Sequence, residues 1–286
     1  MTVLAAEHVE RRDPTQVLRI EPQHSWRLPD LIELWRYREL LYFFVWRDIK
    51  VRYKQTVLGA LWAIIQPLST TLLFTVVFGQ LGGMSKQVSG PYALHVFVGL
   101  LPWTFFSNAV AAAANSLVGS SHLISKVYFP RVLVPIASVA AGLVDFAITF
   151  VTLLGLMAYY GVSPSWMLLT LPFFLAGTIA AAIGAGLLFA ALIVTYRDFR
   201  YVTPFALQLW LYATPVLYGL DIIPARWRAA YALNPMAGMI AGFRAAVLGG
   251  SLSLAVVVIS SLAAVAFFAA GTAYFLRVER RFADVI

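Results

Sequence analysis

The sequence predicts an all-α polytopic membrane protein with six transmembrane helices. Of its 286 residues, 61% are hydrophobic and only 12% are charged, about half the roughly 25% that is usual in a soluble domain. The mean hydropathy of +0.81 reflects more apolar surface than one soluble core would hide. The apolar residues also gather in runs near the ~20 residues that a spanning helix needs. These observations exclude a disordered chain, a cytosolic enzyme and a nucleic-acid-binding domain, even with a net charge of +8.

Six apolar runs account for the predicted spans. In chain order they cover residues 57–79, 92–114, 132–160, 166–195, 204–218 and 254–276. The third and fourth runs are longer than the hydrocarbon layer requires, which predicts tilted or extended helices. The fifth run is short for a full crossing. Residues 57–286 therefore form one predicted transmembrane domain.

Two segments precede this domain. Residues 1–30 mix charged residues with three prolines, and we expect a flexible tail that is not a signal peptide. Residues 31–56 repeat apolar side chains at near-helical spacing, with basic residues on another face and aromatic residues between them. This pattern indicates an amphipathic helix in the membrane interface, directly before the first span. A surface helix of a soluble domain is the alternative.

The distribution of basic residues predicts the orientation. Seventeen Lys and Arg residues precede the first span, follow the last span or lie in the second and fourth connections, and four lie on the other side. Cytoplasmic loops carry such an excess. We therefore expect a multi-pass protein of the inner membrane with both termini in the cytoplasm, which an even number of spans satisfies.

The connection between the fifth and sixth spans, residues 219–253, is too long and too apolar for a simple exterior loop. It holds two short apolar segments, 225–233 and 235–248, separated by Asn234-Pro235. Two half-length helices broken by proline predict a re-entrant helical hairpin, which is tolerated where protein or a water-filled cavity surrounds it. Two interfacial helices on the outer leaflet are the alternative.

The sequence carries no recognisable enzymatic site. It has no Cys, no P-loop, no HExxH motif and only four scattered histidines, so we predict no catalytic residue, no metal and no cofactor on this chain. Asp145 is the one carboxylate expected near mid-membrane, and no basic partner is evident at that depth. We interpret it as a buried carboxyl bonded to Ser, Thr or backbone groups of a neighbouring helix, with a proton or cation site as the alternative.

Three motifs on the predicted cytoplasmic side carry a family resemblance. They are WRDIKVRYKQTVLG at 46–59, followed by Trp62 and QPL at 66–68; LISKVYFPR at 123–131; and YRDFR at 196–200. Together they resemble the membrane subunit of type-2 ABC exporters, from about Leu31 to the C-terminus. The most similar branch exports bacterial surface polysaccharides, namely O-antigen, capsule and wall teichoic acid.

The resemblance implies a division of labour between subunits. Two copies of the chain would form a homodimer and pair with two separate ATPase subunits that bind ATP and Mg²⁺, so the chain itself would not be an enzyme. The substrate would be a lipid-linked glycan, for example on polyprenyl diphosphate, in contact with membrane lipids and without nucleic acid. An exporter of a drug or hydrophobic small molecule is the alternative. A membrane-embedded transferase is a third hypothesis, for which no polar residues converge.

Two cytoplasmic roles follow from the resemblance. The candidate ATPase-coupling residues, in the second and fourth connections, are Ser121, His122, Lys126, Arg131, Arg197, Asp198 and Arg200; ordinary anchoring by positive charge is the alternative. The candidate lipid-phosphate residues of the interface (gate) helix are Arg47, Lys50, Arg52 and Lys54. Such cations attract any anionic lipid, at about 1 kcal/mol per basic residue.

The channel is expected to be enclosed by two copies, with its wall formed by the first, second and fifth spans and the third and fourth packed outside as support. Its candidate lining, which would stack on sugar rings, is Trp62, Phe74, Phe78, Trp103, Phe106, Trp210, Tyr212 and Tyr218. An interfacial aromatic belt is the alternative. Three arginines on the outer side, Arg226, Arg228 and Arg244, either gate the outer opening or snorkel to headgroups.

Overall fold

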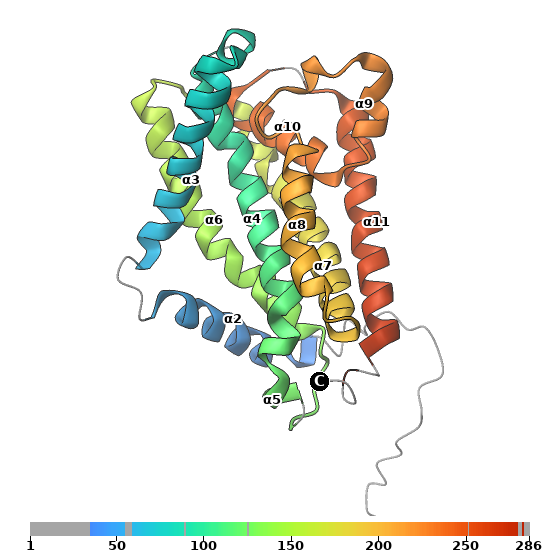
Figure 1. Ribbon diagram of the computed structural model, residues 1–286. Helices are drawn as coiled ribbons and strands as arrows, with labels where there is room; N and C mark the ends of the chain where they lie inside the picture. Colours follow the sequence, from blue (N-terminus) through green and yellow to red (C-terminus); the bar gives the residue numbers. More distant parts are fainter. Residues whose placement is uncertain are drawn as a thin grey trace, which may run out of the picture.

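The computed structural model describes residues 35–54, 59–88, 90–124, 126–250, 252–279 and 282. The predicted tail, and residues 31–34 and 55–56 of the predicted interface helix, lie outside the described residues. Throughout the described ranges the chain is helical and contains no strand, as the composition predicts (Figure 1).

The elements follow one another in a simple order. The α-helices are α2 (Arg38–Tyr53), α3 (Trp62–Phe74), α4 (Tyr92–Gly119), α5 (Ser121–Ile124), α6 (Leu133–Tyr159), α7 (Leu171–Thr195), α8 (Phe199–Tyr212), α9 (Ala225–Tyr231), α10 (Pro235–Leu248) and α11 (Leu254–Val278). Short 3₁₀ or π segments are η1 (Gly59–Leu61), η2 (Thr75–Leu81), η3 (Met84–Gln87), η4 (Trp166–Thr170) and η5 (Leu220–Ile222).

Five of the six predicted spans are helices long and apolar enough to cross a membrane. They are Gly59–Leu81, Tyr92–Gly119, Leu133–Tyr159, Trp166–Thr195 and Leu254–Val278. The fifth predicted span, 204–218, is occupied instead by α8, which begins five residues earlier and ends at Tyr212 in 14 residues. A helix of that length rises about 21 Å, less than the ~30 Å hydrocarbon layer.

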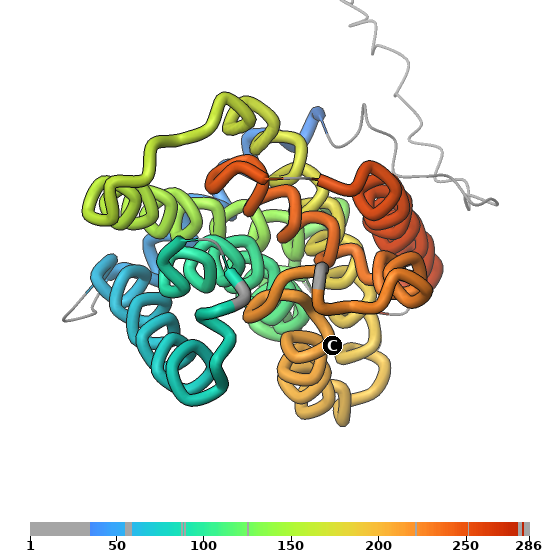
Figure 2. Tube along the Cα trace, turned by 90° about the horizontal axis from the view of Figure 1, so that it is seen from above, coloured from blue at the N-terminus to red at the C-terminus, as the bar shows by residue number. Residues whose placement is uncertain are grey.

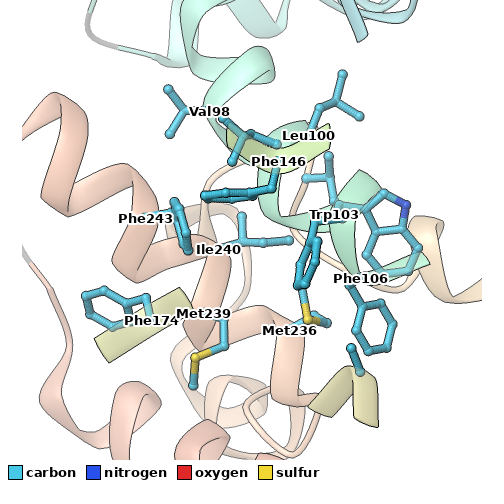
Figure 3. Packing of buried hydrophobic residues seen from close by; sticks show 14 of the residues in the cluster. Val98, Leu100, Trp103, Phe106, Phe146, Phe174, Met236, Met239, Ile240 and Phe243 are labelled. Carbon is cyan, nitrogen blue, oxygen red and sulfur yellow. The ribbon is translucent and has the colours of Figure 1, made fainter. Parts of the chain in front are cut away.

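The long helices pack around α4 and α7. α4 contacts α3, α6, α7, α8 and α10, while α7 also contacts α11, and the view along the bundle shows these two helices at its centre (Figure 2). α7, the fourth predicted span, therefore lies inside the subunit, and its expected position outside the channel wall stays a prediction. In the core, the rings of Phe146 and Phe243 meet edge to face with centroids 6.0 Å apart, and Met236, Met239 and Ile240 fill the space beside them (Figure 3).

The contact between α7 and α11 depends on two glycines. A Cβ at Gly271 would lie 2.0 Å from the carbonyl oxygen of Gly184, and a Cβ at Gly184 would lie 2.4 Å from the carbonyl oxygen of Phe267. Small residues allow this close approach of two membrane helices. The Gly- and Ala-rich fourth span thus packs tightly, as its composition predicts.

The two ends of the bundle differ. At one end, here called the α2 end, α2 lies across the long helices and packs on α6 (Figure 1). At the opposite end, the α9 end, α9 is exposed whereas α10 is almost entirely buried against α4, α7 and α11. The two helices coincide with the two short segments predicted there, and protein surrounds the second.

Candidate functional site

A carboxylate on α6 fastens α2 to the bundle. Asp145 forms an ion pair with Arg52 and accepts a hydrogen bond from the Tyr53 hydroxyl. The two charged side chains are 32% and 26% exposed, for Arg52 and Asp145 respectively. Burial, and then the hydrogen bond to Asp145, raise the pKa of Tyr53 above its ordinary value. The expectation that Asp145 lacks a basic partner is therefore wrong, because the partner comes from the interface helix rather than from another span.

A second polar contact lies one helical turn away. Asp48 accepts hydrogen bonds from Arg47 at 2.8 and 3.0 Å and from the Ser138 hydroxyl of α6 at 3.0 Å. A cavity of about 310 Å³ opens here, lined by Asp48, Val51, Arg52, Ala112 and Ser138. Polar groups of α2 thus face a hollow that reaches α4.

The opposite side of α2 is exposed and mixes aromatic and basic residues. Lys50 lies 5.2 Å from the ring centroid of Trp46, and Lys54 is exposed at the helix end. A cavity of about 380 Å³ follows this side. Of the four predicted lipid-phosphate residues, Lys50 and Lys54 face outward and Arg52 binds Asp145. Arg47 binds Asp48 and also lines the outward cavity with the two lysines. α2 does not have one apolar face and one charged face, because aromatic rings lie both on the side that packs against the bundle and on the exposed side.

The predicted coupling connection is attached to α2 through a small second core. Phe44, the buried side chain of α2, lies 5.4 Å from the ring of Phe129, which belongs to the connection between α4 and α6. Ser121 and His122 begin the short helix α5, and Tyr128 beside it is 89% exposed. This ring contact joins the connection between α4 and α6 to α2.

The coupling residues have different surroundings. Lys126 is exposed, but Arg131 donates from its backbone N–H to the Glu279 carboxylate at 2.9 Å and from its guanidinium to the Glu279 carbonyl. Arg131 thus also holds the end of α11. The remaining three predicted coupling residues, Arg197, Asp198 and Arg200, are exposed at the turn between α7 and α8.

The predicted lining aromatics divide by burial. Trp62 and Tyr212 are 54% and 57% exposed, whereas Trp103 and Phe106 are buried in the subunit core. Phe106 packs on Trp210, with ring centroids 5.0 Å apart. The others, Phe74, Phe78, Trp210 and Tyr218, are half-buried. Since a lining side chain needs an accessible surface, Trp62 and Tyr212 have the most suitable positions within one subunit.

Arg244 lies inside the protein at the α9 end. Its guanidinium donates to the carbonyls of Pro215 at 2.7 Å, Tyr218 at 2.8 Å and Val216. A Cβ at Gly99 would lie 2.6 Å from the same guanidinium, so only glycine leaves room for it. Snorkelling to headgroups does not describe this residue, because its side chain instead binds the chain segment that follows α8.

The two other outer arginines lie on α9. Arg226 is exposed and its guanidinium lies 6.0 Å from the ring of Trp227. Arg228 donates to the carbonyl of Ile223 at 2.9 Å. Both keep the peripheral position that the sequence predicts.

The side chain of Asn234 connects α10 to α8 through hydrogen bonds that the sequence does not predict. Its carboxamide accepts hydrogen bonds from Trp210 at 2.9 Å and from the Met236 N–H at 3.1 Å, and donates to Thr214 at 2.9 Å. It thereby caps α10 and joins it to the end of α8. The Asn-Pro dipeptide is a signal for a helix start, but it carries no sign of the long-range partners.

Among the described residues, no group of three or more His, Cys, Asp or Glu side chains could hold a metal ion. The polar groups near α2 instead make contacts between helices. These contacts attach α2 to α6.

Comparison with known proteins adds a family to this geometry. Residues 39–248 match the ABC-2 type transporter family. The chain is similar to "O-antigen export system permease protein RfbA" of Klebsiella pneumoniae, with 29% identity over 87% of this chain and 95% of the relative. It is 34% identical to the protein of the same name from Myxococcus xanthus, over 74% and 82% of the two chains. "Polysialic acid transport protein KpsM" of Escherichia coli is 26% identical, over 72% and 80%.

Proposed function

Because the chain belongs to the ABC-2 type transporter family, we propose that it is the permease subunit of an ATP-driven exporter of a lipid-linked polysaccharide. The observation that carries this proposal is its similarity, along most of its length, to permeases named for O-antigen and polysialic acid transport. The glycan would be O-antigen-like, capsular or teichoic acid. The chain is a multi-pass protein of the inner membrane and supplies the path rather than the chemistry.

The proposed subunit crosses the membrane six times with both termini in the cytoplasm. Gly59–Leu81, α4, α6, α7 and α11 provide five crossings, and α8 with the segment after it provides the sixth. The basic excess supports this orientation, because α2, the connection that follows α5 and the turn between α7 and α8 lie at one end of the bundle and carry Lys and Arg residues. α9 and α10 then form the re-entrant hairpin of the outer side, and the burial of α10 supports it.

The energy would come from two separate ATPase subunits that bind ATP and Mg²⁺, one beneath each copy of a homodimer. The P-loop that this chain lacks would belong to them. The exposed surface around α5, with Lys126 and Tyr128, would dock on the ATPase. The contact between Phe129 and Phe44 would carry the motion to α2.

Substrate would enter beside α2. Lys50 and Lys54 face outward with Trp46, a combination that suits lipid phosphates at the membrane interface. A diphosphate-linked carrier would be attracted there, next to the hollow between α2, α4 and α6. The polar contacts of Asp145 and Asp48 would hold α2 closed until the ATPase moves it.

Reconstitution tests the proposal. The chain is purified with its genomically neighbouring ATPase and placed in liposomes, and ATP hydrolysis is measured with extracted polyprenyl-linked glycan, with the lipid carrier alone and with a hydrophobic drug. We expect the glycan to stimulate hydrolysis and the chain alone to hydrolyse no ATP. Stimulation by the drug and not by the glycan would overturn the polysaccharide assignment in favour of a drug exporter.

A further inference from the structure

The accessible surface of the subunit is polar on some helices and apolar on others. Every exposed carboxamide among the described side chains lies on α3, η2, α4 or α8. Four of them sit within the helices, away from the α9 end, and are called here the carboxamide row: Gln66 on α3, Asn108 and Asn115 on α4, and Gln208 on α8.

The other long helices show the opposite pattern. Along α6, α7 and α11, the exposed side chains are apolar except near the helix ends, as at Val151, Phe173 and Val265. Such faces suit the acyl chains of lipids. α3 and α8, in contrast, flank α4 and both contact it (Figures 1 and 2). The polar exposed groups are therefore confined to one side of the subunit.

The depth of the row decides what faces it. Asn108 lies 11 residues before the end of α4 at Gly119, or about 17 Å along the helix, which is near the middle of a ~30 Å hydrocarbon layer. A carboxamide in lipid at this depth would have no hydrogen-bonding partner. The side formed by α3, α4 and α8 must therefore face water or a polar ligand rather than lipid.

The row has free hydrogen-bonding capacity. Within the described part of the chain, the carboxamide of Asn108 has no hydrogen-bond partner. Asn115 uses one carboxamide N–H to bind the carbonyl of Ala111 at 2.9 Å, on its own helix. Positions 108, 111 and 115 follow one helix face at the usual spacing of three and four residues. Ala112, beside this face, lines the hollow at Asp48 and Arg52, so the hollow adjoins the row on α4.

We propose that the carboxamide row is a binding surface for the hydroxyl groups of the glycan chain as it passes through the membrane. This inference rests on the proposed function and specifies its substrate path. A carboxamide both donates and accepts hydrogen bonds, as a sugar hydroxyl does, and α3, η2 and α4 contain no Lys, Arg, Asp or Glu. The surface therefore recognises a hydroxyl-rich chain by neutral hydrogen bonds that exchange with water.

A second copy of the chain is a less suitable occupant. A packed contact between copies would close the row along its length and would have to satisfy the buried amides. The row instead lies beside an open hollow that Ala112 lines, where a long chain has room. The predicted aromatic lining is thereby supplemented by polar groups, with Trp62 and Tyr212 on the same helices α3 and α8.

Cysteine labelling tests the row without depending on the substrate. The native chain has no Cys, so Asn108→Cys and Asn115→Cys are each compared with Val265→Cys, an exposed position within α11, in the assembled transporter in liposomes. The probe is a charged, membrane-impermeant methanethiosulfonate. We expect both row positions to react at least about tenfold faster than Val265→Cys. Equal slow reaction, or efficient disulfide crosslinking of Asn108→Cys between two copies, would overturn the inference.

Export by the reconstituted transporter tests the ligand. Asn108→Leu with Asn115→Leu removes the hydrogen-bonding groups with little change in size, and we expect export to fall by about fivefold or more, the effect of one lost hydrogen bond. Asn108→Gln should retain export, and Val265→Leu is the matched control. Unchanged export by the double variant, with wild-type export intact, would overturn the inference alone. Wild-type failure to export any glycan, with row positions still labelled, would instead overturn the proposed function.

Discussion

Asp145→Ala should loosen the attachment of α2 to α6. In the wild-type protein one carboxylate holds two donors from successive residues of α2, the Arg52 guanidinium and the Tyr53 hydroxyl. Removing the carboxylate breaks both contacts, whereas Arg52→Ala breaks only one. The two single variants and the double variant therefore form a thermodynamic cycle for this contact.

The magnitude follows from burial. Arg52 and Asp145 are about one third and one quarter exposed, so solvent screens the ion pair and a freed guanidinium can still reach water. Exposed ion pairs contribute about 0.2–1 kcal/mol, and a hydrogen bond contributes about 1 kcal/mol. We therefore expect Asp145→Ala to cost about 2 kcal/mol, Arg52→Ala about 1 kcal/mol and the double variant no more than Asp145→Ala alone.

Thermal unfolding of the purified protein in detergent, followed by tryptophan fluorescence, measures these differences. At about 2–4 °C per kcal/mol, the melting temperature should fall by about 4–8 °C for Asp145→Ala and by about half as much for Arg52→Ala. Lys54→Ala, exposed at the end of the same helix, is the matched control and should leave it unchanged. Fully additive losses in the double variant would show that Arg52 and Asp145 are not coupled and would refute the reasoning.

Three further outcomes concern packing, pH and coupling. Gly271→Leu should abolish the monodisperse peak in size-exclusion chromatography, because even a Cβ at this position meets the carbonyl of Gly184. Gly155→Leu is the control and should retain the peak, because a Cβ at Gly155 meets no atom within 4 Å. Folding raises the pKa of Tyr53, so above pH about 10 the unfolded chain loses the phenol proton before the folded protein does, and stability should fall as the pH rises further. Between pH 9 and 11 the melting temperature of Tyr53→Phe should therefore fall less than that of the wild-type protein. Equal slopes of melting temperature against pH for the two proteins would contradict this. Lys126→Glu with Tyr128→Ala should leave assembly intact but lower export per ATP at least about fivefold, as expected for about 1 kcal/mol lost at an interface; retained export would contradict a coupling role.

Local composition was sufficient to predict the long apolar helices and α10. The starts at Tyr92, Trp166 and Leu254 coincide with the predicted spans, and α10 occupies 235–248 as expected. These boundaries follow from runs of apolar residues that end where polar or turn residues begin. α8 was less predictable, because the predicted span starts at Pro204 whereas the helix begins at Phe199 and includes this proline in its interior. There the missing N–H of proline removes the hydrogen bond to the carbonyl of Arg200.

The sequence by itself determined that the protein is a multi-span helical membrane protein, because hydropathy and charge act on each segment separately. Only the tertiary structure decided which side chains meet. Asp145 finds its cation 93 positions away in α2, Arg244 binds three carbonyls beyond α8, and Asn108 stays exposed while Trp103, five residues earlier on the same helix, is buried. These outcomes depend on how helices are rotated and packed against one another, and helix rotation is set by contacts between distant segments rather than by local composition.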